Sequence, residues 1–425
     1  MTHPDHDTYS NDFVDNQHSR LMQDFPPAPE HQVLLANWRD PGTARWSFNH
    51  LRQLLPTAPI SPPPISAGYD RHPTPLPRDH LTDLDDLIFT NHDGQSQTLA
   101  GFLDAAQTDC FAVMKDGHLV YDWFGGFGAP DRQHIVFSIT KSMAALLAGV
   151  LVGTGALIPD KLLTDYLPEL GNSAYKGASV RHLLDMQIAS GFTEDYHDED
   201  GIFMAYRRAA AWNPVEEGVM NDGLRAFLTR LPPLDVSSRN HGKYHHYCSP
   251  HSDVLGWLIE RCGDASFADL FSRHILGPCG ARYDAYITLD TYGAPRVSGG
   301  LCITVHDLLN IGQMVLRGGT SGGVQVVPAD WIADLFATFD NSIWLSQNDG
   351  AGPRLFTAGN YRSQWYQPYQ DKDIIASIGI HGQWLWIDRT NNLVIIKLAS
   401  NGTVVDSLTD QSLLNVFAAI TATLA

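Results

Sequence analysis

The sequence contains few cysteines and few basic residues for its length of 425 residues. The five cysteines are an odd number and none have CxxC spacing, so neither a disulfide framework nor a thiolate zinc site is expected. Lys and Arg total 28 against 47 Asp and Glu, which gives a formal charge of −19. Because no basic stretch could follow a phosphate backbone, nucleic acid is not expected as a partner.

Long hydrophobic runs are also absent. The start of the chain, MTHPDHDTYSNDF, lacks a basic region followed by an apolar core. No later stretch reaches about 18 uninterrupted apolar residues, the length that a membrane-spanning helix needs. The sequence therefore predicts neither a signal peptide nor a membrane span, and together with the cysteines it favours a cytoplasmic location.

The composition that remains, 44% hydrophobic and 18% charged residues, permits a sizeable core in one large domain or two lobes. Residues 1–32 are polar and rich in His and Asp, so we expect a disordered tail there. Residues 33–84 are expected to wrap around the domain. They include the proline-rich connector PISPPPISAGYDRHPTPLPRD (59–79), where proline disfavours regular helix and sheet.

Two hairpins are predicted at opposite ends of the remaining chain. FAVMKDGHLVYDWF (111–124) turns at Lys115-Asp116-Gly117, and QWLWID and LVIIKLAS flank the turn RTNN (389–392). A C-terminal helix follows, with Ser407 and Asp410 in capping-box spacing. We therefore expect strands from both ends of the chain to share one sheet.

The stretch between the hairpins is predicted to be rich in helices and loops. TVHDLLNIGQMVLRGG, for example, reads as a helix capped by Thr304 and Asp307 and stopped at Gly318-Gly319. The expected fold is α/β (α+β) over residues 85–425. An antiparallel α/β lobe (85–155 and 375–425) would be flanked by helices, and a helix-rich lobe (156–374) would be inserted into it, leaving a cleft for a small molecule.

Lys141 is the only charged residue in the run VFSITKSMAALLAGVLVGTGAL (136–157). An ammonium in a buried helix is costly unless it is paired or loses its proton. Ser138 lies three residues earlier on the same helix face, so a neutral Lys141 amine could accept the proton of its hydroxyl. The alternative is a lysine that reaches solvent or pairs with a carboxylate. A second copy of the spacing, Ser173 to Lys176, lies in a polar loop and is expected at the surface.

Tyr247 precedes a helix that we expect to begin near Ser252 in YHHYCSPHSDVLGWLIERC. A tyrosine beside a lysine ammonium can relay a proton, so Tyr247, Lys141 and Ser138 form a workable set for acyl transfer. A packed aromatic with one hydrogen bond is the alternative.

The order of these motifs, S-I-T-K, then Y-C-S, then a late strand, resembles the serine β-lactamase and penicillin-binding-protein superfamily. Longer stretches are similar to its 6-aminohexanoate-dimer hydrolase branch: NWRDPGTARWSFNHL, LLDMQ, TEDYHDED, YCSPHSDVLGW, SGGLCIT and IGIHGQWLWID. They extend from about residue 37 to 398. The resemblance implies a β-lactamase/transpeptidase-like fold and no cofactor.

The resemblance also implies a role for each catalytic position. Ser138 would be the nucleophile, Lys141 the general base and Tyr247 the proton relay to the leaving group. The backbone N–H groups of Ser138 and Ile380 would form the oxyanion hole. We therefore expect a serine hydrolase that forms an acyl-enzyme on small carboxylic esters or linear amides.

Five further residues are candidates for substrate binding by the same resemblance: Tyr196, Arg207, Ser298, Ser377 and His381. Tyr196 would lie on a loop that closes over the substrate. Ser377 stands where penicillin-recognising members have the lysine of K-T-G, which weakens a β-lactamase or DD-peptidase-like reading. Arg207 stands where members efficient on 6-aminohexanoate oligomers carry an acid, so amine-ended substrates should bind poorly. Its alternatives are exposure to solvent or pairing with the acids at 194–200.

Two other classes of function remain open at this point. His241, His245, His246, His251 and Asp253 cluster in the sequence and suggest a metal-dependent hydrolase, but Gly242 makes the helix needed for ligand spacing doubtful, so no metal is predicted. A non-catalytic binding protein could also keep this fold. The sequence leaves a homodimer open.

Overall fold

The computed structural model describes residues 20–62, 82–196, 200–219, 221–234, 240–345 and 355–425. Residues 1–19 of the predicted tail lie outside this range. The rest of that tail is ordered, since Leu21 is buried and a 3₁₀ helix, η2, spans Pro29–His31. The expectation of a disordered tail up to residue 32 is therefore wrong for residues 20–32.

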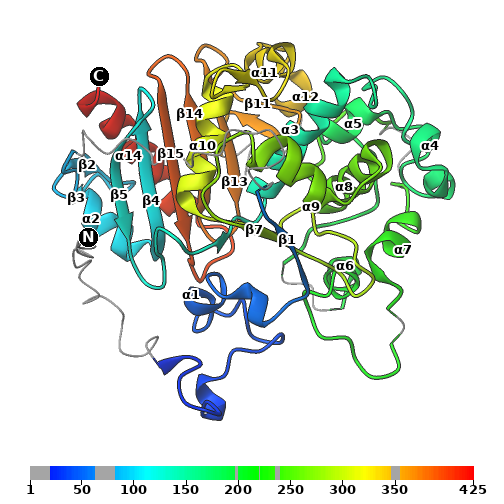
Figure 1. Ribbon diagram of the computed structural model, residues 1–425, viewed down its shortest axis with the longest axis horizontal. Coiled ribbons are helices and arrows are strands. Elements are labelled where there is room, and N and C mark those ends of the chain that lie inside the picture. The colour runs from blue at the N-terminus through cyan, green and yellow to red at the C-terminus, as the bar shows by residue number, and fades with distance from the viewer. Residues whose placement is uncertain (1–19, 63–81, 197–199, 220, 235–239, 346–354) are drawn as a thin grey trace, which may run out of the picture.

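A seven-stranded antiparallel sheet forms the centre of the molecule (Figure 1), with the strand order β11-β12-β13-β14-β15-β4-β5. Its strands are β4 Thr108–Lys115, β5 His118–Phe124, β11 Asn360–Arg362, β12 Trp365–Gln367, β13 Ile374–Gly379, β14 Gln383–Asp388 and β15 Leu393–Ala399. Strand β15 pairs with β4, so the two ends of the chain share one sheet as predicted.

Both predicted hairpins are confirmed. Asp116 and Gly117 have φ values of 52° and 88° between β4 and β5, and this left-handed backbone is what the tight turn requires. The extent of the sheet differs from the prediction, because β11 and β12 come from the range assigned to the helix-rich lobe. The division into two lobes otherwise stays a prediction.

Alternating side chains of the sheet enter two separate cores. Phe111 belongs to the core that contains Val416 and Phe417 of α14 (Ser407–Thr423), whereas its neighbour Ala112 belongs to the core that contains α10 (Val305–Leu316). Helices α10 and α14 thus cover opposite faces of the sheet. Helix α10 is capped by Thr304 as predicted, but the cap of α14 is Asp406 rather than Ser407.

Helices predominate between residues 139 and 345. Besides α10, they are α3 Ile139–Gly153, α4 Leu163–Tyr166, η5 Pro168–Asn172, α5 Val180–Leu184, α6 Ile202–Ala209, α7 Gly223–Thr229, α8 Ser249–Gly263, α9 Phe267–Phe271, η6 Ser272–Leu276, α11 Ala329–Phe336 and α12 Ser342–Leu345. The remaining short elements are α1 Ala44–Ser47, η3 Leu51–Gln53, α2 Leu99–Ala105, the β2/β3 pair (Ile88–Thr90, Ser96–Thr98) and the β9/β10 pair (Thr320–Ser321, Val324–Gln325).

A second sheet has the order β1-β7-β8-β6, with β1 Thr57–Ile60, β6 His134–Ile135, β7 Ala285–Thr288 and β8 Leu301–Ile303. Strand β1 contains Pro59 and Ile60, so the first residues of the proline-rich connector are in a strand, contrary to the prediction. Proline is tolerated there because β1 is an edge strand. Residues 63–79 of the connector lie outside the described range.

In the N-terminal segment, residues 20–62, the part that precedes β1 lies below the main sheet in Figure 1. Its Trp38 and Phe48 share a buried cluster with Phe137 and Trp212. The segment therefore packs directly against the residue that precedes Ser138. Within the described ranges, no helix has both the length and the apolar character needed to cross a membrane.

Candidate active site

Ser138 lies at the tight turn between β6 and α3, where it is the N-cap residue of the helix. The preceding residue, Phe137, has a φ of 43°, a left-handed conformation that a bulky side chain adopts only when its surroundings enforce it. The Phe137 ring lies 4.9 Å from the Phe48 ring and 6.4 Å from the Trp38 ring. Packing by the N-terminal segment therefore supports the turn that presents Ser138.

Lys141 follows in the first turn of α3 and is 1% exposed. Its Nζ donates to Ser138 Oγ at 2.8 Å and to the Ser298 carbonyl at 2.6 Å. Burial lowers the pKa of Lys141 to about 8, an effect that Glu194 and Asp253 partly offset. The side chain does not reach solvent, and its amine can lose a proton close to neutral pH, as a general base requires.

Tyr247 faces the same amine. Lys141 Nζ lies 5.1 Å from the Tyr247 ring centroid. Burial raises the pKa of Tyr247 well above 10, and Tyr366 and Tyr361 raise it further, whereas a hydrogen bond with the Ser138 hydroxyl lowers it. Its hydroxyl is therefore protonated at neutral pH and able to donate. Helix α8, which follows, begins at Ser249, three residues before the predicted start.

Ile380, the predicted second oxyanion donor, follows the end of β13 and lines the same pocket as Ser138. Residue 379, the last residue of β13, must be glycine because the chain there packs closely against the backbone of Val136. A Cβ there would lie 2.7 Å from the Val136 carbonyl oxygen, so any side chain would push the strand end away from the turn before Ser138. The structure thus brings Ile380 to the nucleophile through a position that accepts only glycine.

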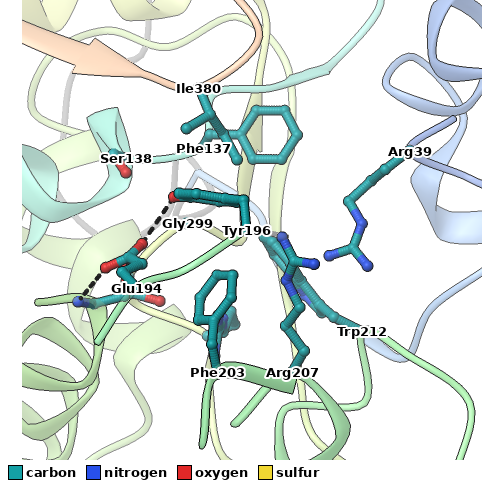
Figure 2. A pocket seen from close by; sticks show the side chains of 13 residues that line it. Arg39, Phe137, Ser138, Glu194, Tyr196, Phe203, Arg207, Trp212, Gly299 and Ile380 are labelled. Carbon is teal, nitrogen blue, oxygen red and sulfur yellow. Dashed lines mark hydrogen bonds between the residues drawn. The ribbon is translucent and has the colours of Figure 1, made fainter. Parts of the chain in front are cut away.

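Tyr196, Arg207 and Ser298 also line this pocket, as Figure 2 shows for the first two. Ser377 and His381, the other two predicted substrate contacts, are not among its lining residues. Ser377 Oγ is 2.7 Å from Ser142 Oγ, and the buried His381 ring hydrogen-bonds the Asn401 carbonyl at 2.7 Å.

Glu194 is a pocket residue that the sequence interpretation missed. Its Oε1 accepts hydrogen bonds from the Tyr196 hydroxyl at 2.8 Å and from Ser249 Oγ at 2.9 Å, and its Oε2 accepts one from the Ser249 N–H at 3.0 Å. Glu194 therefore ties the Tyr196 loop to the N-terminus of α8, where a carboxylate is favoured. The signal was present, since Glu194 and Ser249 lie in the quoted motifs TEDYHDED and YCSPHSDVLGW.

Asp253, considered above as a metal ligand, instead holds the Ser298 backbone. Its Oδ1 accepts the Ser298 N–H at 2.8 Å, and its Oδ2 accepts a hydrogen bond from the Tyr206 hydroxyl and lies 3.5 Å from Arg296 Nη1. Since the Ser298 carbonyl accepts from Lys141, this buried network helps to fix the amine beside Ser138.

The histidines near Tyr247 have separate partners, although the His246 and His251 ring centroids lie 6.0 Å apart. His241 bonds to the backbone of Ala189 and Lys176, and His251 bonds to the Tyr175 hydroxyl. His245 packs between Trp344 and Tyr361, and burial lowers its pKa to about 3. Within the described ranges, no three His, Cys, Asp or Glu side chains are grouped so that they could hold a metal ion.

The second S-x-x-K copy is not a site. Ser173 is buried and donates to the Leu170 carbonyl at 2.8 Å, so its predicted surface position is wrong, whereas Lys176 is exposed as predicted.

Comparison with known proteins agrees with this geometry. A family model described as Beta-lactamase matches residues 96–415. The chain belongs to the β-lactamase family. It is 31% identical over 376 residues to the 6-aminohexanoate-dimer hydrolase of Paenarthrobacter ureafaciens, covering 88% of this chain and 90% of that protein. The predicted membership of this superfamily and resemblance to this branch are confirmed.

Solved structures of β-lactamase-like proteins share the fold. A Bacillus anthracis protein provisionally assigned as a 6-aminohexanoate-dimer hydrolase superposes with a TM-score of 0.80 at 22% identity, covering 92% of this chain and 97% of that one. A family VIII carboxylesterase superposes with a TM-score of 0.51 at 17% identity, covering 74% and 94%. The β-lactamase/transpeptidase-like fold is therefore confirmed, and the protein is a serine hydrolase.

Proposed function

We propose that the protein hydrolyses small carboxylic esters, linear amides or both through an acyl-enzyme on Ser138. The observation that carries this proposal is the 2.8 Å hydrogen bond between Ser138 Oγ and the buried Lys141 amine, whose pKa is lowered to about 8. A serine hydroxyl is a weak nucleophile until an adjacent base accepts its proton, and a neutral lysine amine is such a base.

In the first half-reaction, Ser138 Oγ attacks the substrate carbonyl carbon while its proton passes to Lys141. The negative charge on the carbonyl oxygen is stabilised by the backbone N–H groups of Ser138 and Ile380. The bond to the leaving oxygen or nitrogen then breaks, and Tyr247 relays the proton to the leaving group. Water attacks the resulting ester and loses its proton to the same base, which passes it to Ser138 Oγ as the acyl bond breaks, releasing the acid and free Ser138.

The Tyr196 hydroxyl is proposed to contact the leaving amide or ester. Its hydrogen bond to Glu194 and its position in the pocket with Ser138 support this role. The substrate class follows from the name of the Paenarthrobacter relative, a hydrolase of a short linear amide. Ser377, buried against Ser142, offers no cation where penicillin-recognising members have lysine, which speaks against a β-lactam substrate.

The proposal includes a cytoplasmic location, which the five free cysteines support. A homodimer stays an open prediction.

A fluorophosphonate probe with peptide mass mapping tests the function. We expect labelling on the Ser138 peptide, loss of esterase activity in proportion to labelling, and no effect of EDTA on the unlabelled enzyme. Hydrolysis lost to EDTA would support a metal-dependent enzyme, and a properly folded protein that neither takes the label nor cleaves any ester or ω-amino-acid oligomer would be a binding protein.

A further inference from the structure

Two guanidinium groups lie across the pocket from Ser138. Arg39 comes from the N-terminal segment and Arg207 from α6, and both line the pocket. In Figure 2 their guanidinium groups point toward each other beside the Trp212 ring, while Ser138 lies on the other side of Tyr196. The pocket therefore has a nucleophile at one end and Arg39 and Arg207 at the other; Arg296, a third arginine of its lining, pairs with Asp253.

Neither cation is paired with a carboxylate among the described residues. The neighbouring arginines in the sequence have such partners, since Arg45 lies 3.8 Å from Asp109 and Arg208 lies 2.8 Å from Glu216. Arg39 instead donates to the neutral Asn213 side chain. Of the acids at 194–200 considered above as partners for Arg207, those at 198 and 199 lie outside the described range. Glu194 raises the pKa of Arg207 but is held by hydrogen bonds from Tyr196 and Ser249.

Both side chains rest on aromatic rings. The Arg39 guanidinium carbon is 4.8 Å from the Trp38 ring centroid, and that of Arg207 is 4.3 Å from the Phe203 ring centroid and 5.3 Å from that of Tyr196. This stacking fixes the guanidinium planes and leaves their N–H edges available to a ligand.

The two charges act on each other. Burial lowers the pKa of Arg39 well below its usual value, and repulsion by Arg207 and Arg296 lowers it further. Of the nearby acids, Glu194 is hydrogen-bonded to Tyr196 and Ser249, and Asp253 lies beside Arg296. The exposed Asp40 raises the pKa of Arg39 but offsets only part of the lowering. A chain of net charge −19 thus concentrates positive charge at one end of its active-site pocket. Partly buried like charges are normally avoided unless an anion binds between them.

We propose that Arg39 and Arg207 together bind a carboxylate carried by the substrate at the end distant from the reacting carbonyl. Guanidinium forks match the planar geometry of a carboxylate and form strong charge-assisted hydrogen bonds with it. The aromatic side chains of Phe137, Phe203 and Trp212 line the space between the two ends and suit an aliphatic linker. This inference rests on the proposed function and narrows its substrate class to esters or amides that carry a terminal carboxylate, on either the acyl or the leaving side.

Arg39 is the new element in this inference. It lies in the stretch NWRDPGTARWSFNHL, before residue 96 where the family model begins to match, and no role was predicted for it from the sequence. Arg207 alone could be an isolated surface cation, but two arginines from distant parts of the chain facing one space define a site.

Three p-nitrophenyl esters that differ only in the terminal group test the proposal: the suberate monoester, the octanoate and the 7-aminoheptanoate. We expect kcat/KM in the order anionic, neutral, cationic, with the anionic ester about tenfold to a hundredfold better than the neutral one, since a charged hydrogen bond has that effect. A second series places the terminal group on the leaving alcohol: the butyrate esters of 6-hydroxyhexanoate, hexanol and 6-aminohexanol. Their hydrolysis is measured by titration of the released acid. Preference for the anion in either series supports the proposal and identifies the side.

Variants then assign the preference to the two arginines. Arg39→Met, Arg207→Met and the double variant should reduce the ratio of anionic to neutral kcat/KM toward one, mainly by raising KM for the anionic ester. Arg208→Met is the matched control, because Arg208 pairs with Glu216 and does not line the pocket. It should keep the ratio of the unmodified enzyme.

A competition experiment needs no variant. Suberate should competitively inhibit hydrolysis of p-nitrophenyl octanoate by the unmodified enzyme, and added salt should weaken this inhibition. Heptylamine at the same concentration should inhibit less strongly than suberate. Equal kcat/KM values for the three esters in both series, or a higher kcat/KM for the cationic ester, would overturn the inference. The proposed function survives such a result if Ser138 still takes the fluorophosphonate label and the esters are still cleaved. A protein that neither takes the label nor cleaves the esters would refute the proposed function itself.

Discussion

The two ends of the pocket are built differently. At the nucleophilic end, Lys141 is buried and its amine donates to both Ser138 and the Ser298 carbonyl, so the geometry is fixed by the protein alone. At the opposite end, Arg39 and Arg207 are only partly buried and rest on aromatic rings without an acidic partner among the described residues. The first end is complete without substrate, whereas the second is completed by an anion.

This difference indicates which substitutions should slow the chemical step and which should alter the preference among substrates. A group held by several buried contacts near the reacting atoms acts on kcat, because its position matters in the transition state. A cation that meets only the remote end of a substrate acts on binding. Changes at the two ends should therefore separate in their kinetic signatures.

The largest effect is expected at the nucleophile and its base. Ser138→Ala removes the attacking oxygen and Lys141→Ala the proton acceptor, so each should lower kcat by about 10⁴-fold or more, as single members of a catalytic unit do. Steady-state ester hydrolysis with circular dichroism as a folding check measures this. Ser173→Ala is the control and should keep full activity; a Lys141→Ala enzyme with near-normal kcat would remove lysine from the mechanism.

A smaller loss is expected at Gly379. An added Cβ would lie 2.7 Å from the Val136 carbonyl oxygen, so Gly379→Ala should shift the strand end and with it the Ile380 N–H. Loss of one oxyanion donor costs about 10²–10³ in kcat, with little change in KM. Ala substitution of Gly42, an exposed turn glycine with no atom near its Cβ position and no left-handed backbone, controls for a general loss of backbone freedom. Unchanged kcat in Gly379→Ala would argue against Ile380 as a donor.

The pH profile should follow Lys141. Because its pKa is lowered to about 8 and the neutral form is the base, kcat/KM for a neutral ester should rise about tenfold per pH unit below that value and level off above it. Tyr247 stays protonated through this range, because burial raises its pKa well above 10. A rate independent of pH between 6 and 8 would contradict a lysine base.

The smallest expected effect is on stability and has the opposite sign to the loss of activity. A pKa lowered from 10.5 to about 8 means that the buried ammonium costs about 3 kcal/mol of folding free energy below pH 8. This cost disappears as the pH rises from about 8 to 10.5, where the unfolded chain also loses the proton. Lys141→Met should therefore increase the free energy of unfolding at pH 7 by about 1–2 kcal/mol, after the lost hydrogen bonds are subtracted.

Urea unfolding of both proteins at pH 7 and pH 10 measures that change. The gain should shrink at the higher pH, and a Lys141→Met protein less stable than the unmodified enzyme at pH 7 would show that the amine stabilises the fold.

The sequence predicted the nucleophilic end better than the other end for a physical reason. Ser138 and Lys141 lie one helical turn apart, so their contact follows from local geometry, and an isolated charge in an apolar helix is conspicuous. The hairpins and the cap of α10 were predictable for the same reason, since turn and cap chemistry is local. The additional strands β11 and β12 were missed because three-residue strands carry almost no periodic signal.

The far end depends on contacts between distant segments. Arg39 reaches the pocket because Trp38 packs against Phe137 and Trp212, which are far from it in the sequence. Arg207 was found only through the resemblance to the 6-aminohexanoate-dimer hydrolase branch, and Glu194 was quoted without a catalytic or binding role. No local sequence pattern predicts that residues so far apart in the chain will line one pocket.

Acid quenching of the enzyme during turnover of p-nitrophenyl octanoate, followed by peptide mass mapping, tests the central claim most directly. The account predicts an octanoyl group on the peptide that contains Ser138, present during the steady state, lost when substrate is exhausted, and absent in Ser138→Ala. Octanoyl on a different residue that turns over at the catalytic rate, or hydrolysis that persists in Ser138→Ala, would contradict it.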